Sequence, residues 1–335
     1  MIDETAPHSA APLSSDAVAA APVLAELPEL GILGFDGADA VAFLQGQLSN
    51  DVAALRAGEV QWSSYNSPKG RMLGTLLLWR TGSEAFRAVV SADLAEPLRK
   101  RLSMYVLRAK VKVADLTANW TLFGGDIGAR DAVGAALGAL PAAGHVITID
   151  GTDVVALPDG RLLLSVPREE AAAVRARLLQ RQPLVPSARW HRLAILAGVP
   201  MLVQATQDLF VPQTANWDLI GGINFRKGCY PGQEIVARMH YLGRLKERLF
   251  RFHVAGDPPA PATRIFNSAF GEQPCGTVVN AAPAIDGGSD LLAVVQWSAL
   301  AVSQLHLGTP AGPPLTQRPL PYEVPAPAAP ERPKE

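Results

Sequence analysis

The order of the predicted secondary-structure elements repeats along the chain, and this repeat constrains the fold more than any single motif does. Apolar alternation and turn residues first predict a strand, a helix, three strands, a helix and a strand between residues 31 and 113. The elements are Gly31–Phe35, a helix capped by Asp36 and running through Leu48, Val60–Tyr65, Met72–Trp79, Ala85–Val90, a helix from Asp93 to Leu102, and Ala109–Val113. Asn50 is expected to cap a further short helix that ends at Gly58.

The same order then begins again between residues 120 and 180 with a strand, a helix, three strands and a helix. The elements are Trp120–Phe123, Ala129–Leu140, Val146–Ile149, Val154–Leu157, Leu162–Val166 and a helix from Pro167 to Gln180. The residues themselves do not match between the two stretches. The repeat therefore predicts two similar α+β units lying side by side.

The character of the chain changes from Leu245 onward. Short strands at Leu249–Val254, Gly276–Val279 and Leu291–Gln296 are separated by Pro- and Gly-rich turns, which predicts a small β-barrel. We expect a disordered leader at 1–24, α+β domains at 25–115 and 116–244, a barrel at 245–315 and a Pro-rich tail at 316–335.

Composition excludes several classes of protein. The chain has 335 residues, of which 48% are hydrophobic, enough for two or three domains with their own cores. A formal net charge of -1 argues against a general nucleic-acid surface, and no uncharged apolar run is long enough to span a membrane. The segment from Met1 to Ala21 has no Arg or Lys, so it fits neither a signal peptide nor a transit peptide. The 2 Cys residues cannot build a disulfide framework, so we expect a cytoplasmic protein.

The chemically most suggestive stretch is Lys-Gly-Cys-Tyr-Pro-Gly-Gln-Glu at 227–234. Lys227 lies two residues from Cys229, and Pro231 and Gly232 precede a helix predicted over Gln233–Tyr241. A nearby cation and a helix N-terminus both favour a thiolate. Cys229, assisted by Lys227, is thus the candidate reactive or ligating group, although an isolated Cys is more often a buried apolar residue.

This motif, with Arg238 and Gly243, resembles the signature of the YgfZ family of folate-binding proteins, which are related to the glycine cleavage T-protein, an aminomethyltransferase. Further matching segments are Phe43-Leu44-Gln45-Gly46-Gln47, Asn50-Asp51, Ser67-Pro68-Lys69-Gly70-Arg71-Met72, Phe210-Val211-Pro212-Gln213 and Leu320-Pro321-Tyr322. The resemblance covers the chain from about Leu27 to Tyr322.

The resemblance implies a three-domain ring in which two ferredoxin-like α+β domains and a C-terminal β-barrel surround a pocket for tetrahydrofolate. In such relatives the first two domains can exchange segments. It further implies support of iron–sulfur cluster assembly or repair in client enzymes under oxidative stress, including radical enzymes that modify tRNA. Expected partners are folate, these clients and cluster-assembly proteins, without a stable nucleic-acid complex, a membrane or a metal site.

Two positions depart from the relatives. Aminomethyltransferases carry an acidic pair where this chain has Leu73 and Gly74, and neither residue can act as a general base, so their reaction is not expected here. Relatives often place a pterin-binding Glu before Ala197-Gly198, where this chain has Leu196. A carboxylate there would accept two hydrogen bonds from the pterin, so either another acid such as Asp51 or Glu234 replaces it or the pocket binds pterin weakly.

Family position and side-chain chemistry nominate a set of cofactor-binding residues, each with a simpler structural alternative. Asn50 can equally cap a helix, Glu234 and Arg238 can form an exposed ion pair, and Lys69 and Arg71 can be solvated at a hairpin tip. The candidates are Asn50, Asp51, Lys69, Arg71, Gln213, Tyr230, Gln233, Glu234 and Arg238.

Two other functions stay open at this point. The pocket can serve a folate-dependent one-carbon transferase or demethylase, which turnover of a methylated amine would reveal. Alternatively, the protein is a non-catalytic interaction module with a vestigial pocket, which full function of a Cys229→Ala strain would favour.

Overall fold

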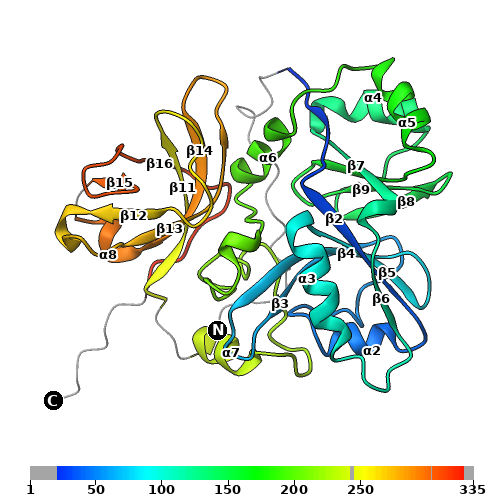
Figure 1. Cartoon of the computed structure of the whole chain (residues 1–335), viewed down its shortest axis with the longest axis horizontal. Helices are drawn as coiled ribbons and strands as arrows, with labels where there is room; N and C mark the ends of the chain where they lie inside the picture. Colours follow the sequence, from blue (N-terminus) through cyan, green and yellow to red (C-terminus); the bar gives the residue numbers. More distant parts are fainter. Residues whose placement is uncertain (1–20, 242–244, 303, 328–335) are drawn as a thin grey trace.

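The computed structural model describes residues 21–241, 245–302 and 304–327, which form three antiparallel sheets (Figure 1). The first sheet has the order β3-β4-β5-β2-β6, and helix α3 packs against β2 and β6. Its elements are β2 (Leu30–Asp36), α2 (Ala40–Gln45), β3 (Val60–Asn66), β4 (Met72–Arg80), β5 (Ala85–Ser91), α3 (Ala92–Ser103) and β6 (Lys112–Asp115).

The second sheet has the order β1-β7-β10-β9-β8. Helices α4 and α5 pack on each other, and α5 also contacts β10. The elements are β1 (Leu24–Glu26), η1 (Thr117–Asn119), β7 (Trp120–Gly125), η2 (Ile127–Ala129), α4 (Arg130–Leu137), β8 (His145–Ile149), β9 (Thr152–Ala156), β10 (Leu162–Pro167) and α5 (Ala171–Leu179).

The strand orders of these two sheets correspond, so the repeat of architecture is present in three dimensions. The second sheet lacks a final strand of its own, and β1 from the start of the chain pairs with β7 in the place that β6 takes beside β2. Leu24, assigned above to the leader, is fully buried in the core of the second unit, whereas its neighbour Ala25 joins the core of the first. Strand β1 and the residues next to it therefore connect the cores of the first two units. The domain boundaries given above remain a prediction.

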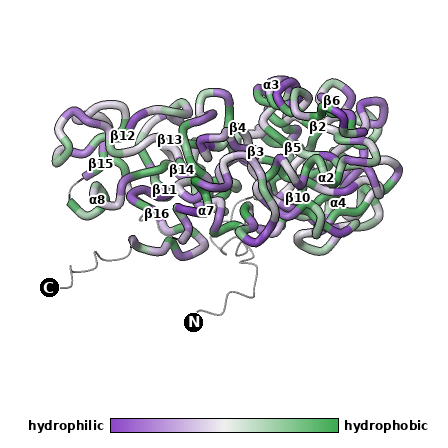
Figure 2. Tube along the Cα trace, turned by 90° about the horizontal axis from the view of Figure 1, so that it is seen from below, coloured by the Kyte–Doolittle hydropathy of each residue, from purple (hydrophilic) through white to green (hydrophobic). Residues whose placement is uncertain are grey.

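The third sheet has the order β15-β12-β13-β14-β11-β16 and curls into a half-barrel, set apart from the other two sheets in both views (Figures 1 and 2). Leu315 N–H donates to the Leu305 carbonyl at 2.8 Å, so the segment that leads into β16 also contacts β15 at the opposite edge. Its elements are β11 (Glu247–Val254), β12 (Arg264–Asn267), η4 (Ser268–Phe270), β13 (Gly276–Pro283), β14 (Ser289–Gln296), α8 (Trp297–Leu300), β15 (Leu305–Leu307) and β16 (Thr316–Arg318).

Helix α6 (Ser187–Leu196) joins the units, because it packs against β1 and β7 on one side and β13 and β14 on the other. A 3-10 turn, η3 (Gln204–Thr206), and an irregular segment follow, and then α7 (Gln233–Tyr241) begins and ends where the sequence predicted. No helix among residues 21–241, 245–302 and 304–327 is long and apolar enough to cross a membrane.

Several local predictions were wrong, for identifiable reasons. The helix expected at Asn50 does not form: Asn50 Oδ1 accepts from the adjacent Asp51 N–H rather than capping a helix, and Nδ2 donates to the Trp62 and Gly221 carbonyls. Asp36 ends strand β2, and α2 begins only after Asp39. The Pro-rich tail is not among these errors, since its described part is held by other units: β16 pairs with β11, and the Tyr322 hydroxyl donates to the Gly198 carbonyl at 2.6 Å.

Candidate functional site

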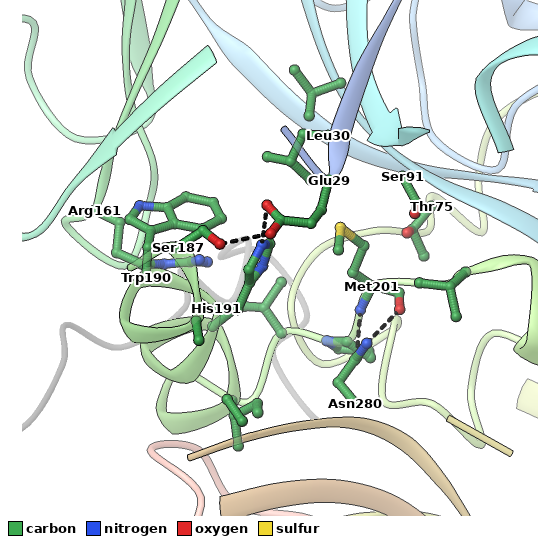
Figure 3. Close-up of a pocket in the computed structure, with 18 of the residues that line it drawn as sticks. Glu29, Leu30, Thr75, Ser91, Arg161, Ser187, Trp190, His191, Met201 and Asn280 are labelled. Carbon is green, nitrogen blue, oxygen red and sulfur yellow. Dashed lines mark hydrogen bonds and ion pairs between the residues drawn. The ribbon is translucent and has the colours of Figure 1, made fainter. Parts of the chain in front are cut away.

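A cavity of about 500 Å³ lies where the three sheets meet α6. Strands β3, β4 and β5 form one wall and α6 forms another (Figure 3). Strand β13 of the half-barrel forms a third side. Its volume is typical of small-molecule sites. Trp62 and Trp190 supply aromatic surface, and Glu29 is the only carboxylate among the lining residues.

Trp190 is held in place by three contacts. A Cβ atom on Gly124 of β7 would lie 2.4 Å from the indole nitrogen, so only glycine allows this close approach. The indole N–H donates to the Leu162 carbonyl at 3.3 Å, and the Arg161 guanidinium lies 4.7 Å from the ring centroid. Arg161 is itself buried and paired with Asp159 at 2.7 Å. This aromatic wall is therefore rigid.

The polar end of the cavity is organised around Glu29, in the loop between β1 and β2. Ser187 Oγ donates to Glu29 Oε1 at 2.6 Å, and His191 Nε2 lies 3.4 Å from Oε2 (Figure 3). Burial raises the pKa of Glu29, but the hydrogen bonds from Ser187, its own backbone and His191 together leave that pKa below its usual value. Burial also lowers the pKa of His191, although Glu29 opposes this effect. At neutral pH the pair thus presents a carboxylate beside a neutral imidazole.

Opposite this end, Asn280 fixes the half-barrel to the segment that follows α6. Its side-chain oxygen accepts from Met201 N–H at 2.8 Å, and its side-chain nitrogen donates to the Met201 carbonyl at 2.8 Å. Both polar atoms of Asn280 are thereby satisfied, so its role is to hold the third unit against the cavity.

The Cys229 motif forms a separate part of the candidate site. Gly232 has a positive φ of 78°, and a Cβ there would lie 2.5 Å from the Ser67 carbonyl oxygen and 2.6 Å from Gly70 Cα. Two glycines thus allow the start of α7 to lie directly on the tip of the β3–β4 hairpin. Cys229, just before this contact, is exposed.

Lys227 does not point along the loop toward solvent. Its buried ammonium donates to the carbonyls of Gln45 at 2.5 Å and Leu48 at 2.6 Å, at the end of α2, and lies 5.0 Å from the Tyr230 ring centroid. Burial lowers the pKa of Lys227 to about 8, against an opposing effect of Asp51. Burial also raises the pKa of Tyr230 to about 12. Lys227 thus fastens the Cys229 loop to α2.

Gln213, Gln233 and Arg71 also make structural contacts. Gln213 donates to the Val236 carbonyl at 2.6 Å, Gln233 donates to the Lys227 carbonyl at 3.3 Å, and Arg71 donates to the Leu209 carbonyl. Asn50 holds the backbone of Trp62 to that of Gly221.

Asp51 accepts from Gln45 Nε2 at 3.0 Å. Lys69, Glu234 and Arg238 are exposed, and none of these three forms an ion pair with a described residue.

None of the site residues predicted from the sequence lines the cavity. Cys229 and the cavity are instead connected by the β3–β4 hairpin, whose base contributes Trp62 and Thr75 to the wall and whose tip carries Gly70. At 3.3 Å per residue, the part of β4 from Met72 to Thr75 spans about 10 Å, and Gly70 lies beyond it in the turn. Leu196 also lies outside the cavity and lines another pocket, on the far side of α6.

Sequence reasoning missed Glu29, Trp190 and His191. Glu29 lies in a short loop without a motif, and its role follows only from the crossing between two sheets. Trp190 and His191 gave a weak signal, since α6 carries two adjacent aromatic side chains directly after its first turn.

Comparison with known proteins identifies the relatives. The tRNA-modifying protein YgfZ of Pectobacterium carotovorum subsp. carotovorum (strain PC1) is 31% identical over 309 residues, which cover 91% of this chain and 92% of that protein. The protein of the same name from Serratia proteamaculans (strain 568) is 31% identical over 312 residues, covering 90% and 92%. The chain belongs to the YgfZ family. No family model matches it.

The fold agrees with this membership. The aminomethyltransferase T of the glycine cleavage system from Bartonella henselae superimposes with a TM-score of 0.74 at 18% identity, covering 90% of this chain and 86% of that one. The predicted T-protein type of fold is therefore confirmed. Within the described ranges of this YgfZ-family chain, no group of three or more His, Cys, Asp or Glu side chains could hold a metal ion.

The contact between Gly232 and the hairpin tip predicts that Gly232→Ala and Gly228→Ala have very different effects on the free energy of unfolding. Gly232→Ala places a methyl group against Ser67 and Gly70 at a positive φ, so we expect a loss of about 2 kcal/mol or more in the free energy of unfolding. Gly228→Ala is the control, since nothing lies within 4 Å of its Cβ position. Urea unfolding measures both, and equal effects would contradict the proposed close approach.

The buried Lys227 ammonium predicts a pH-dependent stability. Its pKa is about 8 in the fold and near 10.5 when unfolded, so the unfolded chain binds more protons between these values. Stability should therefore rise from pH 8 to pH 10.5, by roughly 3 kcal/mol at most.

Wild type and Lys227→Met are compared by urea unfolding at each pH, with the exposed Lys69→Met as control. The rise should disappear only in Lys227→Met. Parallel pH profiles for all three proteins would contradict a lowered pKa at Lys227.

Proposed function

We propose that this protein binds tetrahydrofolate, or a derivative, in the central cavity and supports assembly or repair of iron–sulfur clusters in client enzymes, including enzymes that modify tRNA, through Cys229. The observation that carries the proposal is a cavity lined by two indoles, of which Trp190 is held by its neighbours, and by one carboxylate, at the junction of all three sheets of a T-protein fold. The relatives' name supports the link to tRNA modification, and a cytoplasmic location would suit such clients.

The chemistry of the lining fits a reduced pteridine. A flat heterocycle gains from aromatic and aliphatic walls such as Trp62, Trp190 and Leu77. Its amino and amide N–H groups need an acceptor, and the side chain of Glu29 remains 50% exposed despite its two partners. A carboxylate accepts two such hydrogen bonds, so Glu29 supplies the acid that Leu196 cannot. Bound tetrahydrofolate would supply one-carbon chemistry at its N5 and N10 atoms.

Cys229 is proposed to act on the client rather than in the cavity. Its side chain is exposed on a loop that Lys227, Gly232 and Gln233 hold in place. A thiol presented in this way can contact a sulfur or iron species on a partner protein, whereas Cys275 is buried with its Sγ 3.5 Å from the Ile265 carbonyl. In this proposal Cys229 acts from the loop that contacts the tip of the β3–β4 hairpin and not from a place beside the cavity, as the sequence had suggested.

The transferase alternative receives no support from the cavity. Strand β4 contributes Thr75 and Leu77 to the wall, while Leu73 and Gly74 supply no acid. Glu29 lies on a different element, next to His191 rather than on β4, so the acidic pair of the aminomethyltransferases has no equivalent there.

The role of Glu29 is tested by anaerobic calorimetric titration with tetrahydrofolate. Glu29→Gln should bind at least about tenfold more weakly than wild type, because a charged acceptor is lost from the polar end of the cavity. Glu26→Gln, a nearby exposed acid outside the cavity, should bind as wild type does. Absence of binding by wild type would refute the folate proposal, and equal binding by Glu29→Gln would refute the assigned anchor.

The role of Cys229 is tested by complementing a strain that lacks the gene. Cys229→Ser should fail to restore the activities of several iron–sulfur enzymes under oxidative stress and the methylthiolation of tRNA, whereas Cys275→Ala should restore both. Because Cys229 is exposed, the thermal unfolding midpoint of Cys229→Ser should match wild type, which separates lost function from lost folding. Full complementation by Cys229→Ser would exclude thiol chemistry.

A further inference from the structure

A second cavity, of about 800 Å³, lies on the opposite side of α6 from the central one. Four basic side chains line it: Arg192 from α6, Arg251 and His253 from β11, and Arg318 from β16. The two cavities are neighbours along β13 and the turn that follows it, since Pro283 lines the first and Ala284 the second. None of these basic residues belongs to the site described above.

The strand register concentrates positive charge in this cavity. Arg251 is the direct cross-strand partner of Arg318 in the β11–β16 pair. Like charges placed directly opposite each other destabilise a sheet, so this pairing needs compensation. Asp290 supplies part of it, because its carboxylate favours the charged form of Arg251, but its two oxygens already contact Arg192 at 2.7 Å and His253 at 3.3 Å.

The hydrogen-bonding capacity of Arg251 is also unused. Its Nε atom is buried and has no hydrogen-bond partner, and no acid among the described residues forms an ion pair with Arg251 or Arg318. The other lining acid, Asp286, is exposed and likewise unpaired within the described chain. Arg251 and Arg318 both line the cavity and neither is paired with an acid of the described chain, so an anion bound there would meet two guanidinium groups that lack a charged partner.

We propose that this second cavity binds an oxyanion, either a phosphate group or a pair of carboxylates, between Arg251 and Arg318. Guanidinium groups match such oxyanions in a two-bond geometry, and an anion placed there neutralises the cross-strand repulsion. Arg192 and His253, both in contact with Asp290, line the neighbouring part of the cavity. The ligand is either a phosphate-bearing small molecule or a chain of carboxylates. If that chain is the glutamate tail of a folate bound in the central cavity, this part of the proposal rests on the function proposed above.

The test uses calorimetric titration of the full chain at constant ionic strength with two probes, inorganic phosphate and γ-linked triglutamate, and with chloride as the reference anion. Wild type should bind at least one probe, and Arg251→Gln and Arg318→Gln should each bind it about tenfold or more weakly. Arg168→Gln, an exposed arginine outside the cavity, should bind as wild type.

A stability measurement guards against trivial loss of folding. Without ligand, Arg318→Gln should unfold at the same or a higher temperature than wild type, because one of the opposed charges is gone. The binding probe should raise the unfolding temperatures of wild type and Arg168→Gln more than those of Arg251→Gln and Arg318→Gln. Binding of phosphate alone indicates a phosphate-bearing ligand, and this conclusion stands even if tetrahydrofolate does not bind in the central cavity. Binding of triglutamate alone indicates a carboxylate chain. If neither probe binds beyond chloride, or if both variants bind as wild type does, the proposal is wrong.

Discussion

The crossing from β1 to β2 is the constraint on which the rest of the molecule depends. Only Leu27, Pro28 and Glu29 separate a strand of the second sheet from a strand of the first. Since four residue steps span at most about 14 Å, the two sheets must lie against each other. The same crossing places Glu29 at the junction, where Ser187 and His191 on α6 contact it. The cavity and its carboxylate thus both follow from one short loop.

The β3–β4 hairpin connects the two parts of the candidate site. Its base forms a wall of the cavity with Trp62 and Thr75, and its tip receives the start of α7 through the contact between Gly70 and Gly232. Asn50 adds a further connection by holding the Trp62 backbone to Gly221. The cavity and Cys229 are therefore positioned by the same element, although no residue belongs to both.

Local patterns predicted those elements whose signals are short in range. The Pro-Gly pair before Gln233 was enough to place α7, and alternation placed β3 and β4 with the turn between them. Strand β1 escaped prediction because it has only three residues beside an Ala- and Pro-rich leader, and its partner β7 lies about a hundred positions away. The contact of Asn50 escaped prediction for a similar reason, since its side chain donates to the distant Gly221 carbonyl.

By itself the sequence determined the family, the repeated α+β order, the C-terminal sheet and the exposed Cys loop, because each depends on motifs or periodicities within a few residues. Tertiary structure alone decided which strand completes the second sheet, which acid reaches the central cavity and which arginines face each other beyond α6. It also decided that Lys227 binds the end of α2 rather than solvent. Such features depend on contacts between distant segments, whose geometry is set by packing and burial and leaves no local pattern in the chain.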